Sequence, residues 1–210
     1  MARFTNQAQL RYGNAVTNSN IAVGEILEVL SATKTAVRNT YGQSDTVTYI
    51  VSIVNSGTTP ITGISVTDNL GEYTFGTTTL VPLTYIDGTV KYYVNGVLQP
   101  SAVVTAGPPL VVSGITVPAG GSVTVAYEAA VNEFAPLDTT SVINNTAIVA
   151  GTGITPITAE EEITVESTPV LTITKSVSPV PVTENGTLTY TFLIQNSGNV
   201  AADASTGGVV

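Results

Sequence analysis

Thr33–Gly57 reads TKTAVRNTYGQSDTVTYIVSIVNSG, and its second half alternates apolar and polar residues. Alternation at every second position predicts a strand with one buried face, formed here by Val47, Tyr49, Val51 and Ile53. The same pattern recurs later in the chain, at Val123, Val125, Tyr127 and Val131. The sequence contains no amphipathic helical segment of note, so the pattern predicts an all-β fold.

This stretch is repeated within the chain. Thr174–Gly198 reads TKSVSPVPVTENGTLTYTFLIQNSG and aligns with it without a gap, at an offset of 141 residues and with nine identities in 25 positions. The alignment keeps the TK start and the NSG end in register. The second copy begins near Val170, stops at Val210 and is therefore incomplete.

The N-terminus offers the counterpart of a late strand, because Phe4–Leu10 resembles Ile143–Val149. The chain then consists of the end of one repeat, a whole repeat and the start of another. The predicted boundaries are an N-terminal strand segment at 1–26, a complete repeat at 27–167 and the opening strands of a second repeat at 168–210.

Composition excludes several functional classes. The 210 residues include no Cys, His or Trp, so disulfides, thiol nucleophiles, imidazole bases and His-ligated metals are ruled out. Only 10% of residues are charged and the net charge is -9, which argues against nucleic acid as a partner. No apolar run approaches the roughly 20 residues of a membrane-spanning helix. Thr and Val are abundant, and both favour sheets.

The complete repeat contains roughly nine or ten predicted short strands in about 140 residues, a pattern typical of an antiparallel β-sandwich of immunoglobulin-like type. Asp87-Gly88 and Asn95-Gly96 have the chemistry of tight hairpin turns. Tyr85–Leu98 is therefore predicted to form strand, turn, strand, turn, and to account for the extra length of this domain.

Five segments, in this order, carry a family resemblance: TK, VTYIVSIVNSG, ISVTDNL, ITVPAGGSVTVAYEAAV and INNTAIVAG. Their order and spacing resemble a bacterial and archaeal cell-surface repeat of immunoglobulin-like fold, the family called domain of unknown function eleven. The resemblance covers roughly 27–166 and resumes at Val170. It implies a stalk, adhesin, surface-layer or clostridial spore-appendage protein, located outside the cell on a cell or spore surface. It implies no enzymatic activity and no cofactor.

The chain has only three lysines, and two of them, Lys34 and Lys175, occupy the same repeat position. Alternation places Lys34 on the apolar side of its strand, together with Leu30, Ala32 and Ala36. The same parity places Asp68 in line with apolar residues of a middle strand, and Asn145 in line with those of a late strand. A buried charge requires a partner, so these three side chains are predicted to meet.

An inward Lys, Asp and Asn are the groups of an autocatalytic isopeptide bond. A neutral Lys34 would attack the side-chain carbonyl of Asn145 while Asp68 acts as the proton shuttle and ammonia leaves. The alternative is an ordinary buried Lys34–Asp68 ion pair with Asn145 hydrogen-bonded beside it.

The incomplete second repeat predicts how copies assemble. Its opening strands expose an apolar face, which a strand from another copy would cover. The candidate donor residues are Phe4, Asn6, Ala8 and Leu10, and Asn6 would then approach Lys175 as a possible intermolecular link. The second copy ends before any counterpart of Asp68. A longer tandem array is the alternative interpretation of these ends.

Two further features of the sequence are weaker signals of a binding site. Glu160–Glu162 suggests calcium, but adjacent strand residues point to opposite faces, so a solvated edge is favoured and no metal site is predicted. Several tyrosines could form a sugar-stacking platform, although tyrosine on sandwich strands more often packs in the core; they are Tyr41, Tyr49, Tyr73, Tyr85, Tyr92 and Tyr93.

The sequence therefore predicts a structural protein, not an enzyme: a subunit of an extracellular or spore-surface fibre that assembles head to tail with copies of itself. The alternative is an adhesive module that binds a host, matrix or glycan ligand whose identity the sequence does not give.

Overall fold

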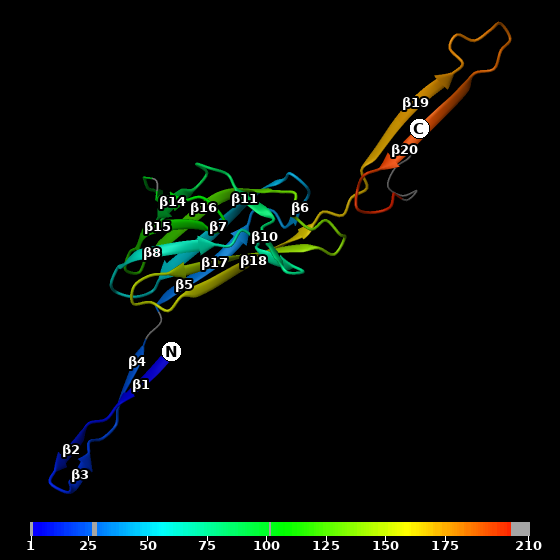
Figure 1. Ribbon diagram of the computed structural model, residues 1–210. Coiled ribbons are helices and arrows are strands. Elements are labelled where there is room, and N and C mark those ends of the chain that lie inside the picture. The colour runs from blue at the N-terminus through cyan, green and yellow to red at the C-terminus, as the bar shows by residue number, and fades with distance from the viewer. Residues whose placement is uncertain (1, 27–28, 101, 203–210) are drawn as a thin grey trace.

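The computed structural model describes residues 2–26, 29–100 and 102–202, and every regular element in them is a β-strand. Figure 1 shows a central sandwich, with a hairpin extending from it at the N-terminal end and another at the C-terminal end. The first two residues of the predicted complete repeat, 27–28, and the last residues, 203–210, lie outside the described part of the chain. No helix in that part is long and apolar enough to cross a membrane.

The first sheet of the sandwich has the strand order β13-β12-β16-β7-β5, and β11 also pairs with β16. All of its pairs are antiparallel. The strands are β5 (Leu30–Ala36), β7 (Thr46–Asn55), β11 (Leu83–Tyr85), β12 (Lys91–Val94), β13 (Val97–Leu98) and β16 (Ser122–Val131).

The second sheet has the order β14-β15-β8-β17-β18-β6, antiparallel except for the short parallel pair β18–β6. Its strands are β6 (Thr40–Tyr41), β8 (Ile61–Asp68), β14 (Val103–Thr105), β15 (Leu110–Val117), β17 (Val142–Ala150) and β18 (Ile157–Val165). A separate short hairpin pairs β9 (Tyr73–Phe75) with β10 (Thr78–Leu80). The predicted immunoglobulin-like antiparallel β-sandwich is confirmed, although it contains more short strands than expected.

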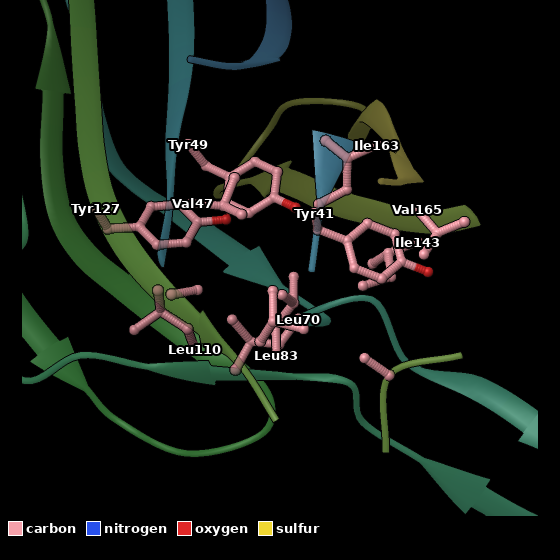
Figure 2. Packing of buried hydrophobic residues seen from close by; sticks show 13 residues of the cluster. Tyr41, Val47, Tyr49, Leu70, Leu83, Leu110, Tyr127, Ile143, Ile163 and Val165 are labelled. Carbon is pink, nitrogen blue, oxygen red and sulfur yellow. The ribbon is translucent and has the colours of Figure 1, made fainter. Parts of the chain in front are cut away.

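The core lies between the two sheets and follows the predicted alternation. On β7 every second residue from Val47 to Asn55 is buried, and on β16 every second residue from Val123 to Val131 is buried. Figure 2 shows one of the two core clusters, in which the rings of Tyr41, Tyr49 and Tyr127 lie among aliphatic side chains from both sheets. Burial of such a continuous apolar face is the main stabilising contribution to a sandwich.

The two predicted hairpin turns have different outcomes. Asn95 and Gly96 both adopt positive φ, 49° and 78°, and connect the paired strands β12 and β13 as expected. Asp87-Gly88, in contrast, does not close a hairpin. The strands before and after it, β11 and β12, both pair with β16 and so lie one after the other along the same neighbour.

The internal repeat is present in the structure. The hairpin of β19 (Leu171–Ser178) and β20 (Thr189–Asn196) has the register of β5 and β7 shifted by 141 residues, with Lys175 opposite Phe192 as Lys34 is opposite Val51. Its turn after β20 also repeats: Asn196 accepts a hydrogen bond from the Gly198 N–H at 3.0 Å, as Asn55 does from Gly57 at 2.9 Å.

The N-terminal segment is a long hairpin. β1 (Ala2–Asn6) pairs with β4 (Ala22–Ile26), and β2 (Gln9–Tyr12) pairs with β3 (Ala15–Asn18) at the tip. The predicted donor residues Phe4, Asn6, Ala8 and Leu10 therefore do not lie on one continuous strand, because the pairing is interrupted at residues 7–8. Ser19 occupies the interruption, donating its N–H to the Ala8 carbonyl and accepting from the Ala8 N–H.

Candidate crosslinking site

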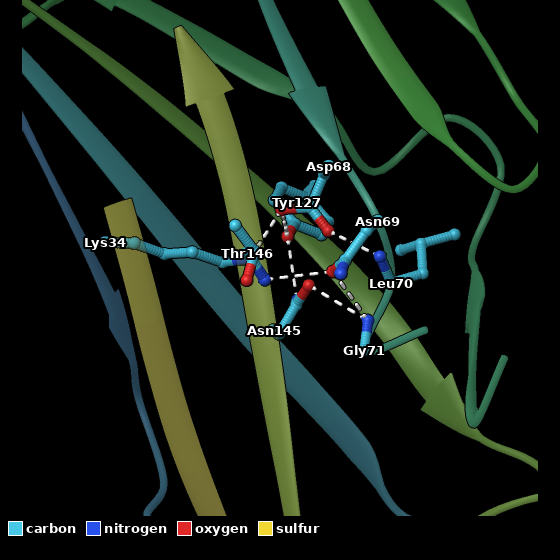
Figure 3. Close-up of polar contacts among 8 residues, drawn as sticks. All are labelled: Lys34, Asp68, Asn69, Leu70, Gly71, Tyr127, Asn145 and Thr146. Carbon is cyan, nitrogen blue, oxygen red and sulfur yellow. Dashed lines mark hydrogen bonds and ion pairs between the residues drawn. The ribbon is translucent and has the colours of Figure 1, made fainter. Parts of the chain in front are cut away.

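Lys34, Asp68 and Asn145 are brought together inside the sandwich from three different strands, β5, β8 and β17. Their relative exposures are 4%, 1% and 0%, so all three polar side chains are removed from water. Figure 3 shows Lys34 reaching from β5 toward Asp68 and Asn145 on the opposite sheet. The parity predicted from sequence is thus confirmed at each of these positions.

A short chain of hydrogen bonds joins the three residues through a fourth. Lys34 Nζ lies 2.5 Å from Asp68 Oδ2, and the Tyr127 hydroxyl donates to the same oxygen at 2.5 Å. Asn145 Nδ2 donates to the Tyr127 hydroxyl oxygen at 3.3 Å. Tyr127 of β16 therefore connects the carboxylate to the amide.

Backbone N–H groups of the turn that follows β8 hold the side-chain oxygens of Asp68 and Asn145 in place. The Leu70 N–H donates to Asp68 Oδ1 at 3.0 Å, and the Gly71 N–H reaches Asn145 Oδ1 at 3.2 Å. Gly71 shares this N–H with Asn69 Oδ1, at 3.0 Å. Leu70 and Gly71 have φ values of 55° and 74°, and positive φ is uncommon for a residue such as leucine. Strained backbone of this kind is characteristic of functional sites.

Two stacked tyrosines cover the cluster. The rings of Tyr49 and Tyr127 lie 5.7 Å apart, and Lys34 Nζ is 4.9 Å from the centre of the Tyr49 ring. The Tyr49 hydroxyl lies near Asn145, and this contact acts to lower the pKa of Tyr49 against the larger effect of burial. Both rings therefore belong to the surroundings of Asn145.

Burial shifts the protonation of the site. Desolvation lowers the pKa of Lys34 from 10.5 to about 8, although Asp68 opposes the shift. Desolvation, followed by the charge of Asp68, raises the pKa of Tyr127 well above its ordinary value. Lys34 is thus readily converted to a nucleophilic neutral amine, whereas Tyr127 keeps its hydroxyl proton.

The lowered pKa of Lys34 predicts a pH dependence of stability wherever this residue remains a free amine, as in Asn145→Ala. The unfolded state, with the higher Lys34 pKa, binds more protons between about pH 8 and pH 10.5, so stability rises with pH through that window. We expect the free energy of unfolding to increase by about 2 kcal/mol between pH 7 and pH 9.5. Urea titrations measure it, and an additional Lys34→Met substitution should abolish the increase.

The sequence predicts that Glu160–Glu162 lie on a solvated edge, and this is wrong for one of the three. Glu160 and Glu162 are exposed, but Glu161 is half-buried on the inward side of β18, directly opposite Asn145. Its charge acts to raise the pKa of Lys34. Within the described residues, no group of three or more acidic side chains is placed to hold a metal ion.

The tyrosines predicted as an alternative sugar-stacking platform do not form one continuous exposed surface. Tyr41 and Tyr49 are fully buried, and the Tyr41 hydroxyl donates to the Pro136 carbonyl at 2.5 Å. Tyr73, Tyr85, Tyr92 and Tyr93 are half-buried on three different strands. Tyr41 and Tyr49 are therefore core residues, as tyrosines on sandwich strands more often are.

Lys175 and Asn6 are not brought together within one chain. Lys175 Nζ lies 4.4 Å from the centre of the Tyr190 ring, the contact that Lys34 makes with Tyr49 in the complete repeat. Asn6 is on β1, opposite Ala22. A link between them would thus require a second copy.

Sequence reasoning missed the roles of Tyr127 and Gly71. Tyr127 was recognised as an inward residue of its strand, but alternation does not indicate which polar groups an inward hydroxyl will meet. Gly71 directly follows Asp68-Asn69-Leu70, and a glycine after such a segment indicates a turn. That signal locates the turn without showing that its N–H points toward Asn145.

No family model and no curated protein matches this sequence. Similar solved structures include the full-length major pilin SpaD from Corynebacterium diphtheriae, at 16% identity and a TM-score of 0.49, covering 70% of this chain and 37% of that one. BcpA, the major pilin subunit of Bacillus cereus, is 11% identical with a TM-score of 0.44, covering 81% and 49%. The pilus backbone RrgB from Streptococcus pneumoniae is 14% identical with a TM-score of 0.45, covering 58% and 31%. This chain thus spans between 31% and 49% of the length of these structures.

Proposed function

We propose that this protein is a structural subunit of an extracellular fibre on a cell or spore surface, assembled head to tail from identical copies. The observation that carries the proposal is the pair of end hairpins, each with apolar residues that the described chain leaves uncovered. On the C-terminal hairpin, Ile173, Phe192 and Ile194 are 61%, 55% and 59% exposed. On the N-terminal hairpin, Phe4 and Leu10, two of the candidate donor residues, are 56% and 66% exposed.

The complete sandwich provides the template for the junction. Its last hairpin, β17–β18, comes directly before β19, just as the N-terminal hairpin comes directly before β5. In the sandwich, strands β17 and β18 belong to the sheet that covers the inward face of β5 and β7. The N-terminal hairpin of one copy would cover β19 and β20 of the next copy in the same way.

This arrangement extends the predicted donor strand to a donor hairpin. A contact between two different surfaces of identical subunits is heterologous, so it propagates into a filament instead of closing a dimer. Asn6 of β1 would approach Lys175 of the neighbouring copy, as Asn145 approaches Lys34. The Lys34–Asn145 isopeptide bond within each subunit is the second part of the proposal.

The assembly is tested by electron microscopy and light scattering of the purified chain. The full chain should form filaments, and deletion of residues 1–26 should leave monomers, because the covering hairpin is absent. The full-length Ile194→Asp variant should also stay monomeric, since a carboxylate would have to be buried at the junction. The matched control is Val97→Asp, on strand β13 of the central sandwich, where the valine is 63% exposed; it should polymerise normally. Filaments formed without residues 1–26 would rule out the junction.

An adhesive module is the second candidate function, and a groove at one end of the sandwich favours it. The groove is lined by residues at the starts of β5, β8 and β18, including Leu30, Ile61 and Ile157, and by the loop 152–156. The lining of the groove contains both threonine hydroxyls and apolar side chains. A stable monomer that binds a glycan array would support this function over the fibre.

A further inference from the structure

The proposed crosslinking reaction requires a proton to reach the nitrogen that leaves. The Asn145 amide is a poor leaving group unless Nδ2 is protonated as the bond to Cγ breaks. Asp68 is the acid that contacts Lys34, but the described contacts include no direct hydrogen bond between Asp68 and Asn145. Tyr127 bridges them: its hydroxyl donates to Asp68 Oδ2 at 2.5 Å and accepts from Asn145 Nδ2 at 3.3 Å.

The carbonyl side of the same amide also has a fixed donor. The Gly71 N–H points to Asn145 Oδ1 from 3.2 Å, and the positive φ of Gly71 sets this direction. A Cβ at this position would lie 2.6 Å from Ile143 Cγ2, so the turn accepts only glycine without rearrangement. A preorganised backbone donor stabilises negative charge that develops on a carbonyl oxygen.

We propose that Tyr127 is a catalytic residue of the Lys34–Asn145 crosslinking reaction, which relays a proton from Asp68 to Asn145 Nδ2 while the Gly71 N–H stabilises the oxyanion. This inference rests on the crosslink proposed above and adds the groups that carry the reaction. The nitrogen of the Asn145 amide contacts Tyr127 of strand β16, and the oxygen contacts the Gly71 N–H in the turn after strand β8.

Asp68 removes one proton from the Lys34 ammonium, and the amine lone pair forms the Nζ–Cγ bond while the carbonyl electron pair moves to Oδ1. In the tetrahedral intermediate Nδ2 is an amine with a free lone pair and Asp68 is protonated, so both hydrogen bonds of Tyr127 reverse their direction. Asp68 then donates to the Tyr127 oxygen, whose own proton passes to Nδ2. The oxyanion collapses, the Cγ–Nδ2 bond breaks and ammonia leaves. The second proton lost from Nζ returns through Asp68 to the departing ammonia, so an amide and one ammonium ion form and Asp68 is again a carboxylate.

Tyr41 provides the matched control. It is a fully buried tyrosine of the same core cluster as Tyr127, but its hydroxyl donates to the Pro136 carbonyl. Tyr49 is not suitable, because its hydroxyl lies near Asn145. Removing the hydroxyl of Tyr41 or of Tyr127 changes the core by one oxygen atom, and of these two only the Tyr127 hydroxyl lies between Asp68 and Asn145.

The experiment follows the linked fraction of newly synthesised full chains by intact mass, since each crosslink makes the chain lighter by one ammonia. Tyr127→Phe should link about 10²- to 10⁴-fold more slowly than the unsubstituted protein, the usual contribution of general acid catalysis. Tyr41→Phe should link at the unsubstituted rate. Circular dichroism and thermal melting of both variants establish that they are folded.

The outcomes separate this inference from the proposal on which it rests. An unsubstituted chain of unmodified mass overturns both. A linked unsubstituted chain together with a folded Tyr127→Phe variant that links equally fast overturns the relay alone. If Tyr127→Phe does not fold, fluorinated tyrosines incorporated at position 127 keep the ring and hydroxyl while making the hydroxyl more acidic. A linking rate that changes with this acidity supports the relay, and an unchanged rate overturns it.

Discussion

The Asp68→Ala variant should be strongly destabilised, and it should remain uncrosslinked. The substitution removes the carboxylate and leaves the Lys34 ammonium buried without a partner. Breaking a buried ion pair in this way costs about 3–5 kcal/mol of stability. It also removes the acid that the crosslinking reaction needs. Since domains are stable by only about 5–15 kcal/mol, we expect substantial unfolding at ambient temperature, measured by urea denaturation and intact mass.

The control for Asp68→Ala removes both charges. A Lys34→Met and Asp68→Leu double variant cannot crosslink, but it leaves no unpaired charge in the core, and well-packed apolar replacements of buried pairs are often tolerated. The double variant should therefore be several kcal/mol more stable than Asp68→Ala. Equal stability of the two would show that the buried ammonium is not the source of the loss.

Asn145→Ala should abolish the crosslink while leaving the Lys34–Asp68 pair in place. The proposed covalent bond would close a loop of about 110 residues, and on the entropy model developed for disulfides such a closure stabilises by about 4–5 kcal/mol. We expect the free energy of unfolding to fall by this amount, together with the loss of the mass change. Urea denaturation at pH 7 and intact mass measure the two effects.

Asn144 supplies the matched control for Asn145→Ala. It is the preceding residue of the same strand, β17, but it is exposed, whereas Asn145 is fully buried. Asn144→Ala should still be lighter by one ammonia than the mass calculated from its own sequence, and it should be as stable as the unsubstituted protein. If the unsubstituted protein has the mass calculated from its sequence and is no more stable than Asn145→Ala, then the site is only a buried ion pair with an adjacent amide.

The inward side chains could be predicted from sequence because strand geometry is strictly periodic. Once Leu30, Ala32 and Ala36 define a buried face, the position of Lys34 follows, and the same reasoning holds for Asp68 and Asn145. The register of β19 against β20 could likewise be derived from the repeat. These inferences need only the chain direction and a period of two.

Other features depend on contacts between strands that are distant in sequence. The chain around Asp87-Gly88 has the residues of a hairpin turn, yet β16 holds both flanking strands along one edge. Tyr127 and Glu161 face inward by parity, but their neighbours are set by how the two sheets are placed over each other. The interruption at residues 7–8 depends on the opposite strand, where Ser19 completes the hydrogen bonding of Ala8.

The strands that lead into the two end hairpins also determine how tension would pass through a fibre. Load applied along such a filament would enter the sandwich at β5 and leave it at β18, the strands next to the two end hairpins. With Lys34 bonded to Asn145, the chain between these residues would be bypassed, and only the two outer segments would carry force. About 110 residues, equivalent to roughly 350–400 Å of extended chain, would remain folded under load. Each subunit would then behave as a nearly inextensible link instead of a spring that unravels.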